Sequence, residues 1–381
     1  MLTTSKRLLQ FPEYVFSSLA KEAKKIEETS GKKILNLSIG SPDFPPGEIY
    51  VKKLKEYIDT PGSHLYPGYG ATRGFANGLI HWYKTRFGVE LNQNELFPLL
   101  GAKDGVSHIA MALVDEGDEI LVPNPGYPAF TGPALIMGCT VVPYALLEEN
   151  QFKLSLSEIE KKITEKTRMI WVNFPSNPTG QVISLSELEP LVALCRKKNI
   201  WLVYDNAYAE ITYGGCISPS ILEIPGAKDI AVEIGSFSKM YSFAGFRMGW
   251  IVGNAQAIAA LAKIKSQFDS GLSLPFQELA AYAFVHPDIQ WHKEMIDSYM
   301  KKKETLMKIF ASFGLIMNNP KGGLYLWAKI PEAFQNANEY TMELLKTKYV
   351  LVTPGSAFGT NGNRYVRICF SADITHLSHY V

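Results

Sequence analysis

The 381-residue sequence has no excess of charge of either sign, because 38 lysines and arginines are balanced by 37 aspartates and glutamates. Nucleic-acid binding relies on a basic face that neutralises phosphates, so no nucleic-acid partner is expected. Cysteine is also scarce, with four residues at positions 139, 195, 216 and 369 and no C-x-x-C pair. This pattern indicates reduced thiols in a cytoplasmic protein, and we expect neither a disulfide framework nor a metal site.

Long hydrophobic runs are missing as well. No segment approaches a membrane span, and the start, MLTTSKRLLQFPEYVF, lacks the apolar core of a signal peptide. The hydrophobic content of 46% is nevertheless ordinary for a globular protein. We therefore expect a cytoplasmic protein with large buried cores and no membrane partner.

Short apolar runs alternate with helical patterns through the middle of the chain. Buried strands are predicted at residues 119–123, 140–144, 168–174, 200–205, 230–236 and 247–253. Between two of them, SLSELEPLVALCRKKN carries apolar residues on one helical face, with Ser184 or Ser186 available as its cap. This alternation predicts an α/β fold with a mostly parallel sheet covered by helices on both faces.

The pattern changes towards the C-terminus. A long helical stretch, roughly residues 275–312, precedes a predicted hairpin with Gly322 and Gly323 near its turn. The N-terminal forty or so residues have no strand ladder of their own, and we expect them to pack against this part. The predicted division is a large domain at residues 45–274, and a smaller α+β domain built from residues 1–44 and 275–381.

The stretch EIGSFSKMYSFAGFRMGW places a single lysine, Lys239, in a tight loop straight after a predicted strand. A surface lysine needs no such setting, whereas a lysine used as an amine nucleophile must be positioned and kept partly dry. Ser236, Ser238 and Arg247 surround it in the sequence. The loop is therefore a candidate catalytic site.

Other unusual residues also follow predicted strands, at the edge where ligands bind in a parallel sheet. Asp205 ends an apolar run, where a carboxylate needs a cation or hydrogen-bond donors. Asn177 stands before a proline that forces an extended conformation, and Tyr127 lies on a stiff loop, NPGYPAF. The turn GAKDG opens a predicted helix whose N-terminus can hold a phosphate.

Each of these features has an ordinary explanation when it is taken alone, such as a plain turn or a core tyrosine. Their common position after successive strands is the more specific signal. One ligand would explain the set, namely an aromatic aldehyde that bears a ring nitrogen, a phenolic oxygen and a phosphate.

With these motifs the chain resembles the fold-type I pyridoxal-phosphate enzymes of the class I/II aminotransferases, from LNLSIGSPDFPPG (35–47) to RYVRICF (364–370). The segments FPEYVF, GAKDGVSHI, LVPNPGYPAF and KSQFDSG are most similar to the LL-diaminopimelate aminotransferase group. The resemblance implies a homodimer that binds pyridoxal 5'-phosphate. It also implies transfer of an amino group from an amino acid, possibly LL-diaminopimelate, to 2-oxoglutarate by a ping-pong mechanism.

The resemblance further implies roles for individual residues. Lys239 would bind the cofactor covalently and then move the substrate proton, while Asp205 would keep the ring nitrogen protonated. The other implied cofactor contacts are Tyr127 on the ring, Asn177 and Tyr208 on the phenolic oxygen, and, on the phosphate, Ser236, Ser238, Arg247, the backbone of Ala102 and Lys103, and Tyr66 from the neighbouring subunit.

The substrate would be held by a second set of residues. Arg367 would grip the α-carboxylate in a bidentate fork, for which lysine is a poor replacement. Asn177 would lie beside it, and Gly40 and Tyr14 would line the substrate entrance.

Several alternatives stay open at this point. The donor could be aspartate, methionine or an aromatic amino acid, and Gln267 stands where the diaminopimelate group tends to have asparagine. A C–S lyase on the same scaffold would use the same lysine, aspartate and arginine. A non-catalytic effector-sensing module is a remote alternative, because the sequence shows neither an N-terminal helix-turn-helix nor a basic patch.

Overall fold

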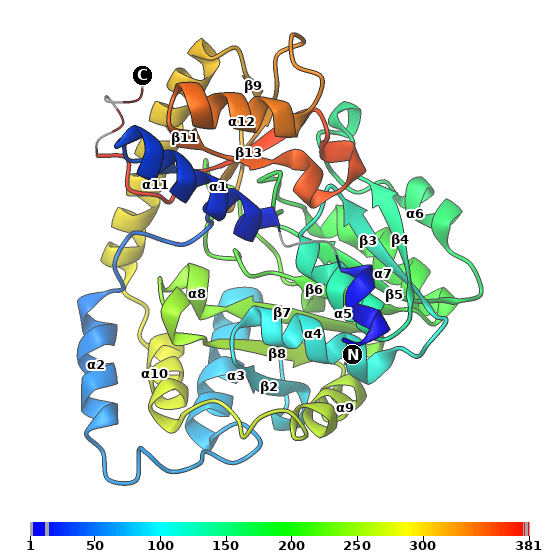
Figure 1. The fold of residues 1–381 in the computed structure, drawn as a ribbon. Coiled ribbons are helices and arrows are strands. Elements are labelled where there is room, and N and C mark those ends of the chain that lie inside the picture. The colour runs from blue at the N-terminus through cyan, green and yellow to red at the C-terminus, as the bar shows by residue number, and fades with distance from the viewer. Residues whose placement is uncertain (1–2, 12–14, 376, 378–379, 381) are drawn as a thin grey trace.

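The computed structural model describes residues 3–11, 15–375, 377 and 380, and a seven-stranded sheet lies at its centre (Figure 1). Its strand order is β2-β8-β7-β6-β5-β3-β4. Strand β8 is antiparallel to β2 and β7, and all the other neighbouring pairs are parallel. The strands are β2 (Leu96–Leu99), β3 (Glu119–Asn124), β4 (Thr140–Ala145), β5 (Thr167–Asn173), β6 (Trp201–Asp205), β7 (Ala231–Ser236) and β8 (Gly249–Gly253). The predicted mostly parallel α/β sheet is confirmed.

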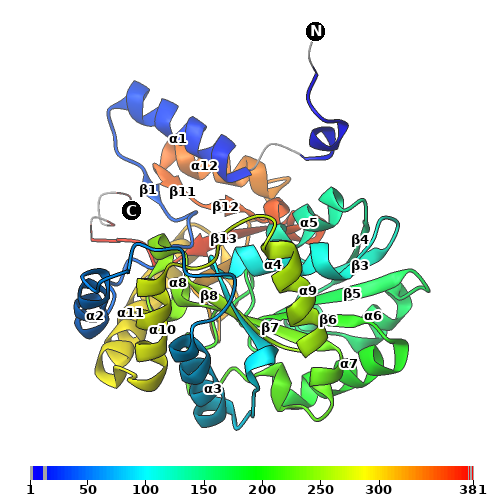
Figure 2. The ribbon, with the colours of Figure 1, turned by 90° about the horizontal axis from the view of Figure 1, so that it is seen from below.

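Helices cover both faces of this sheet (Figure 2). In β6, Leu202 and Tyr204 belong to one buried apolar cluster and Val203 to another on the opposite face. Burial on both faces explains why these strands are continuous apolar runs. One face carries α4 (Ala102–Leu113), α5 (Thr131–Ile136) and α9 (Ala255–Lys265), and the other α2 (Glu48–Ile58), α3 (Arg73–Phe87), α6 (Leu156–Lys162), α7 (Leu185–Lys198) and α10 (Leu274–Val285).

A second, smaller sheet has the antiparallel order β12-β13-β10-β9, and β1 pairs in parallel with β11 beside it. The apolar side chains of α1 and α12 pack together, and the two helices lie side by side in both views (Figures 1 and 2). The bounds are β1 (Leu35–Asn36), β9 (Ile316–Met317), β10 (Tyr325–Lys329), β11 (Val350–Leu351), β12 (Thr353–Pro354), β13 (Tyr365–Cys369), α1 (Val15–Ser30), α11 (Ile289–Ser312) and α12 (Ala337–Thr347).

The helical stretch predicted at 275–312 is two helices, α10 and α11. Proline at position 287 has no N–H to donate and restricts the residue before it, so the first helix ends there. Asp288 then starts α11, because its side chain accepts a hydrogen bond from the backbone N–H of Trp291 at 3.0 Å. The hairpin of β9 and β10 forms as predicted, with Gly322 and Gly323 in its connection.

The carboxyl ends of β5, β6 and β7 lie next to one another. Asn173, the last residue of β5, pairs in register with Asp205, the last residue of β6, and β7 ends at Ser236. Parallel order therefore brings polar residues from distant parts of the sequence to one edge of the sheet.

Among the described helices, none combines the length and apolarity that a membrane crossing requires.

Candidate active site

A cavity of about 430 Å³ lies at this edge, between the large and small sheets. It is lined by these predicted site residues: Gly40, Ala102, Lys103, Tyr127, Asn177, Asp205, Tyr208, Ser236, Ser238, Lys239, Arg247 and Arg367. Two predicted residues are not part of this lining. Tyr66 is 86% exposed, and Tyr14 lies outside the described residues.

Lys239 lies in the short helix α8 (Phe237–Met240), directly after β7, and its side chain reaches the segment that follows β1. Its ammonium donates a hydrogen bond to the carbonyl of Gly40. Burial, with a contribution from the positive charges of Arg367 and Arg247, lowers the pKa of Lys239 to about 8. The neutral form of this amine, which nucleophilic attack requires, is thus far more populated near neutral pH than in an ordinary lysine.

Asp205 places a buried carboxylate at the floor of the cavity. The backbone N–H of Ala207 donates to Oδ1 at 3.2 Å, and the amide of Asn173 donates to the Asp205 backbone carbonyl at 2.9 Å. Burial raises the pKa of the Asp205 carboxyl to about 7. Within the described chain no Lys, Arg or His nitrogen lies within 4.0 Å of it, so a cationic ligand group is needed to stabilise its ionised form.

The opposite end of the cavity is suited to an anion. The turn before α4 contains Gly101 at φ 84°, and a Cβ there would lie 2.5 Å from the Arg247 guanidinium, so only glycine fits. Arg247 Nη1 donates to the carbonyl of Ala244 at 2.7 Å and to Ser238 Oγ at 3.4 Å. The N-terminal N–H groups of α4, a guanidinium and serine hydroxyls therefore meet at one point.

Arg367 supplies a second, fully buried guanidinium from β13. Nη1 donates to Asn177 Oδ1 at 2.9 Å, and Nη2 donates to the carbonyl of Ser38 at 2.6 Å. The guanidinium carbon lies 4.2 Å from the ring centre of Tyr325 and 4.7 Å from that of Phe358. These contacts fix the orientation of a cation that can bind a carboxylate.

Two polar lining residues, Tyr325 and Asn173, were not predicted from the sequence. Tyr325 Oη lies 2.9 Å from Tyr208 Oη, and a Cβ on Gly40 would lie 1.9 Å from Tyr325 Oη, so this glycine makes room for the tyrosine. Asn173 is the last residue of a strand, as Asp205 is, so the search for polar residues at strand ends could have found it. Tyr325 is the first residue of β10, in the continuous apolar run LYLWA, where the sequence gives no sign of its partners.

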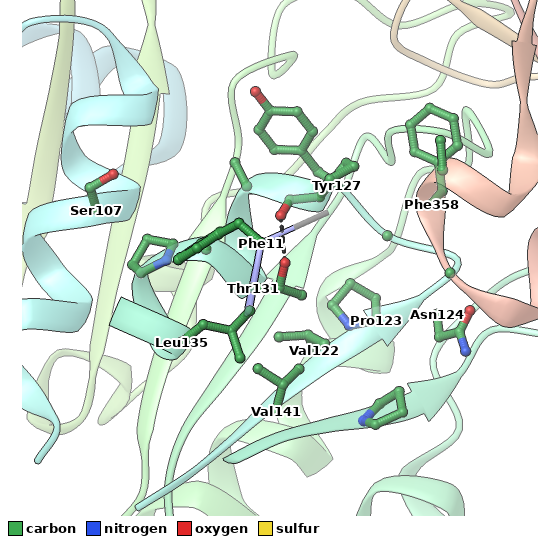
Figure 3. Close-up of a pocket in the computed structure, with 18 of the residues that line it drawn as sticks. Phe11, Ser107, Val122, Pro123, Asn124, Tyr127, Thr131, Leu135, Val141 and Phe358 are labelled. Atoms are coloured by element: carbon green, nitrogen blue, oxygen red, sulfur yellow. Dashed lines mark hydrogen bonds between the residues drawn. The ribbon is translucent and has the colours of Figure 1, made fainter. Parts of the chain in front are cut away.

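A second cavity, of about 570 Å³, lies beside the first (Figure 3). Lys103 and Tyr127 line both cavities, and the remaining described residues of the second lining carry no ionisable side chain. Thr131 Oγ1 in this lining donates to the carbonyl of Pro128 at 2.8 Å (Figure 3), and Thr360 Oγ1 accepts from the side-chain amide of Asn124 at 2.9 Å. The larger cavity thus offers apolar surface, and the acid–base groups face the smaller one.

The smaller cavity fits pyridoxal phosphate. The carboxylate of Asp205 matches a protonated ring nitrogen, the amine of Lys239 matches an aldehyde, and the cluster around Arg247 matches a phosphate. Arg367 is a separate cation, available for a substrate carboxylate.

Comparison with known proteins agrees with this fit. Residues 32–378 match the model of the family described as aminotransferase class I and II. The chain is 36% identical to the LL-diaminopimelate aminotransferase of Oleidesulfovibrio alaskensis over 100% of this chain and 97% of that one. It is 35% identical to LL-diaminopimelate aminotransferase 2 of a Nostoc species, over 96% and 94%. BacF from Bacillus subtilis, bound to substrate, superposes with a TM-score of 0.94 at 29% identity, covering 100% of this chain and 96% of that one.

Proposed function

Because the chain belongs to the class I and II aminotransferases, which are transaminases that depend on pyridoxal phosphate, we propose that it moves an amino group from an amino acid to 2-oxoglutarate by a ping-pong mechanism. The observation that carries the proposal is the cavity shared by Lys239, Asp205 and Arg367. A ping-pong reaction uses one site for two substrates in turn, and both substrates share the carboxylate that Arg367 would bind.

We assign the chemical roles from the environment of each side chain. When bound, pyridoxal phosphate supplies an aldehyde that joins amines and a ring that accepts electrons from the substrate Cα. The amine of Lys239 would hold that aldehyde, and the same amine in its free form would take a proton from the substrate Cα. The lowered pKa of Lys239 supports this role. Asp205 holds the proton on the ring nitrogen.

The cavity lining supports the remaining cofactor contacts that we propose. The N-terminus of α4, Arg247 and the serine hydroxyls hold the phosphate. Tyr127 would lie against the ring, and Asn177 and Tyr208 would donate to the phenolic oxygen. The hydrogen bond between the hydroxyl groups of Tyr208 and Tyr325 supports a fixed position for Tyr208.

The donor is the finer part of the proposal. We propose LL-diaminopimelate as the first candidate, since the two curated relatives described above carry that name. Arg367 would hold the α-carboxylate, with Asn177 keeping one edge of the guanidinium in place and Gly40 and Tyr14 at the entrance. Aspartate, methionine, aromatic amino acids and a C–S lyase reaction are the alternative outcomes of the test.

We also propose a homodimer in which Tyr66 reaches the phosphate of the neighbouring subunit. Tyr66 lies far outside its own cavity lining, and it is exposed together with Leu65, Tyr69 and Phe268, which are 60%, 62% and 62% exposed. Apolar side chains exposed at this density favour an interface. Sedimentation of the holoenzyme tests the dimer. A monomer that retains full activity would contradict it.

A panel of amino donors tests the function. Each donor is incubated with the holoenzyme and 2-oxoglutarate, and glutamate, residual donor and ammonia are measured. We expect glutamate to form in equal amount to the donor consumed, and initial-rate plots to give parallel lines. Ammonia and a keto acid formed without an acceptor would indicate the lyase. If hydrophobic amino acids react rapidly and LL-diaminopimelate does not react, the proposed donor is wrong, but the protein is still an aminotransferase.

A further inference from the structure

A buried charged cluster lies under the turn that begins α4, outside the cavity described above. Lys265, the last residue of α9, is only 2% exposed, and its Nζ lies 2.6 Å from Asp104 Oδ2 and 2.6 Å from Asp269 Oδ2. A lysine buried so deeply needs a carboxylate partner to offset its desolvation, and here two carboxylates share it. This cluster joins α4, α9 and the loop after α9.

Asp104 connects the cluster to the turn at Gly101 through hydrogen bonds. Its carboxylate accepts the backbone N–H of Leu100 at 2.8 Å, and its own N–H donates to the carbonyl of Gly101 at 3.1 Å. Nδ1 of His108 lies 2.7 Å from the other carboxylate oxygen. Burial alone would raise the pKa of Asp104, but hydrogen bonds from His108 and Lys265 outweigh it and lower the pKa, so Asp104 is ionised.

Asp269 extends the cluster to the loop that carries Tyr66. Its Oδ1 accepts the backbone N–H of Gly271 at 2.8 Å. Gly271 has φ 94°, and a Cβ there would lie 2.3 Å from the carbonyl oxygen of Gly68, so the two backbones are in direct contact. Asp269 is thus linked through Gly271 to the loop around Gly68, two residues from Tyr66.

We propose that Lys265 is a positioning residue for the cofactor phosphate. Through Asp104 it holds the turn whose N–H groups face the phosphate, and through Asp269 it holds the loop that presents Tyr66 to the second subunit. The inference rests on the proposed function, in which both groups bind phosphate. The ammonium of Lys265 then positions both the α4 turn, which contacts the phosphate in the same subunit, and Tyr66, which contacts the phosphate in the partner subunit.

Lys265→Met tests this, because it removes the charge and keeps the length of the side chain. The matched control is Lys228→Met, which breaks the ion pair with Glu95, 2.9 Å long and remote from the turn. Dissociation constants of pyridoxal phosphate and of pyridoxal, which has no phosphate, are measured on the cofactor-free proteins. Dimer content is checked by sedimentation.

In Lys265→Met we expect the dissociation constant of pyridoxal phosphate to rise at least about tenfold, because displaced backbone donors lose their alignment with the ligand. The constant for pyridoxal is expected to stay within about twofold, and Lys228→Met to change neither. With saturating cofactor, kcat should stay within about threefold, because Lys265 does not line the cavity.

Asp104→Asn serves as a second variant, since it removes the charge but keeps an oxygen for Leu100, and it carries the test if Lys265→Met does not fold. An unchanged constant for pyridoxal phosphate, or equal losses for pyridoxal phosphate and pyridoxal, would overturn the inference, because the effect would then be general destabilisation. If the unmodified protein fails to bind pyridoxal phosphate, the proposed function itself is wrong.

Discussion

The two neighbouring cavities share Lys103 and Tyr127, yet they differ in the other ionisable side chains that line them. The apolar cavity is larger, about 570 Å³ against about 430 Å³, but the described residues of its lining offer no carboxylate. The smaller cavity holds a buried aspartate with a raised pKa and a lysine with a lowered pKa. Volume is therefore a poor guide to the active site, and unfavourable desolvation of ionisable groups is a better one.

The largest expected effect comes from replacing Lys239, which lines the smaller cavity and not the apolar one. Lys239→Ala removes the only amine that α8 brings into the smaller cavity, so turnover and the visible absorption of the lysine-bound cofactor should be lost together. Absorption spectra and glutamate formation measure the two losses. Lys84→Ala, at an exposed ion pair with Glu90, is the control and should change neither. Transamination by Lys239→Ala would remove the proposed mechanism.

Asp205→Asn tests the second distinguishing group through pH. A folded-state pKa raised from 3.8 to about 7 means that the cofactor-free folded protein binds the proton more tightly than the unfolded chain. The carboxylate then lowers the unfolding free energy as the pH rises from about 4 to 7. At pH 8 the variant should be more stable than the unmodified protein by about 2–4 kcal/mol, and at pH 4 the two should be similar.

Urea titrations of both cofactor-free proteins at pH 4, 6 and 8 measure this difference. Glu233, whose pKa is also raised to about 7 by burial, titrates in both proteins and cancels in the comparison. A difference that does not vary with pH would show that Asp205 is not held in the desolvated state described above.

Arg367→Lys addresses substrate binding and should have a smaller effect. Lysine keeps the charge but loses the planar pair of donors, one of which bonds Asn177. We expect kcat/KM to fall by about 10–100-fold for both the amino acid and the oxo acid, mostly through KM, while cofactor affinity is unchanged. Steady-state kinetics with each substrate test this. A loss confined to one substrate would argue against a shared carboxylate site.

Val122→Ala tests the apolar cavity and should have the smallest effect. Val122 is buried in β3 and lines only this cavity. Removing two methyl groups should lower the unfolding free energy by about 1–2 kcal/mol and leave kcat/KM within about twofold. Urea unfolding and steady-state rates measure the two. A large loss of activity at unchanged stability would show that the apolar cavity takes part in catalysis.

The sheet and the edge that carries the site could be predicted, because strands buried on both faces leave continuous apolar runs and parallel strands end together. The residues after β5, β6 and β7 were found in this way. What escaped prediction depends on contacts between distant segments. Lys265 ends a helix, where lysine usually meets solvent, and its partner Asp104 lies far away in the sequence. Tyr325 likewise faces the cavity only because the small sheet is placed against the large one.

The carbonyls of Ser38 and Gly40 accept hydrogen bonds from Arg367 and Lys239, respectively. Between them, the side chain of Ile39 is 55% exposed and makes neither contact. A fluorescent label attached at this position would lie at the wall of the smaller cavity, next in sequence to both carbonyls, without replacing either of them. Residue 39 is therefore a natural place for a reporter that follows, in real time, when the amine and the guanidinium exchange backbone for ligand.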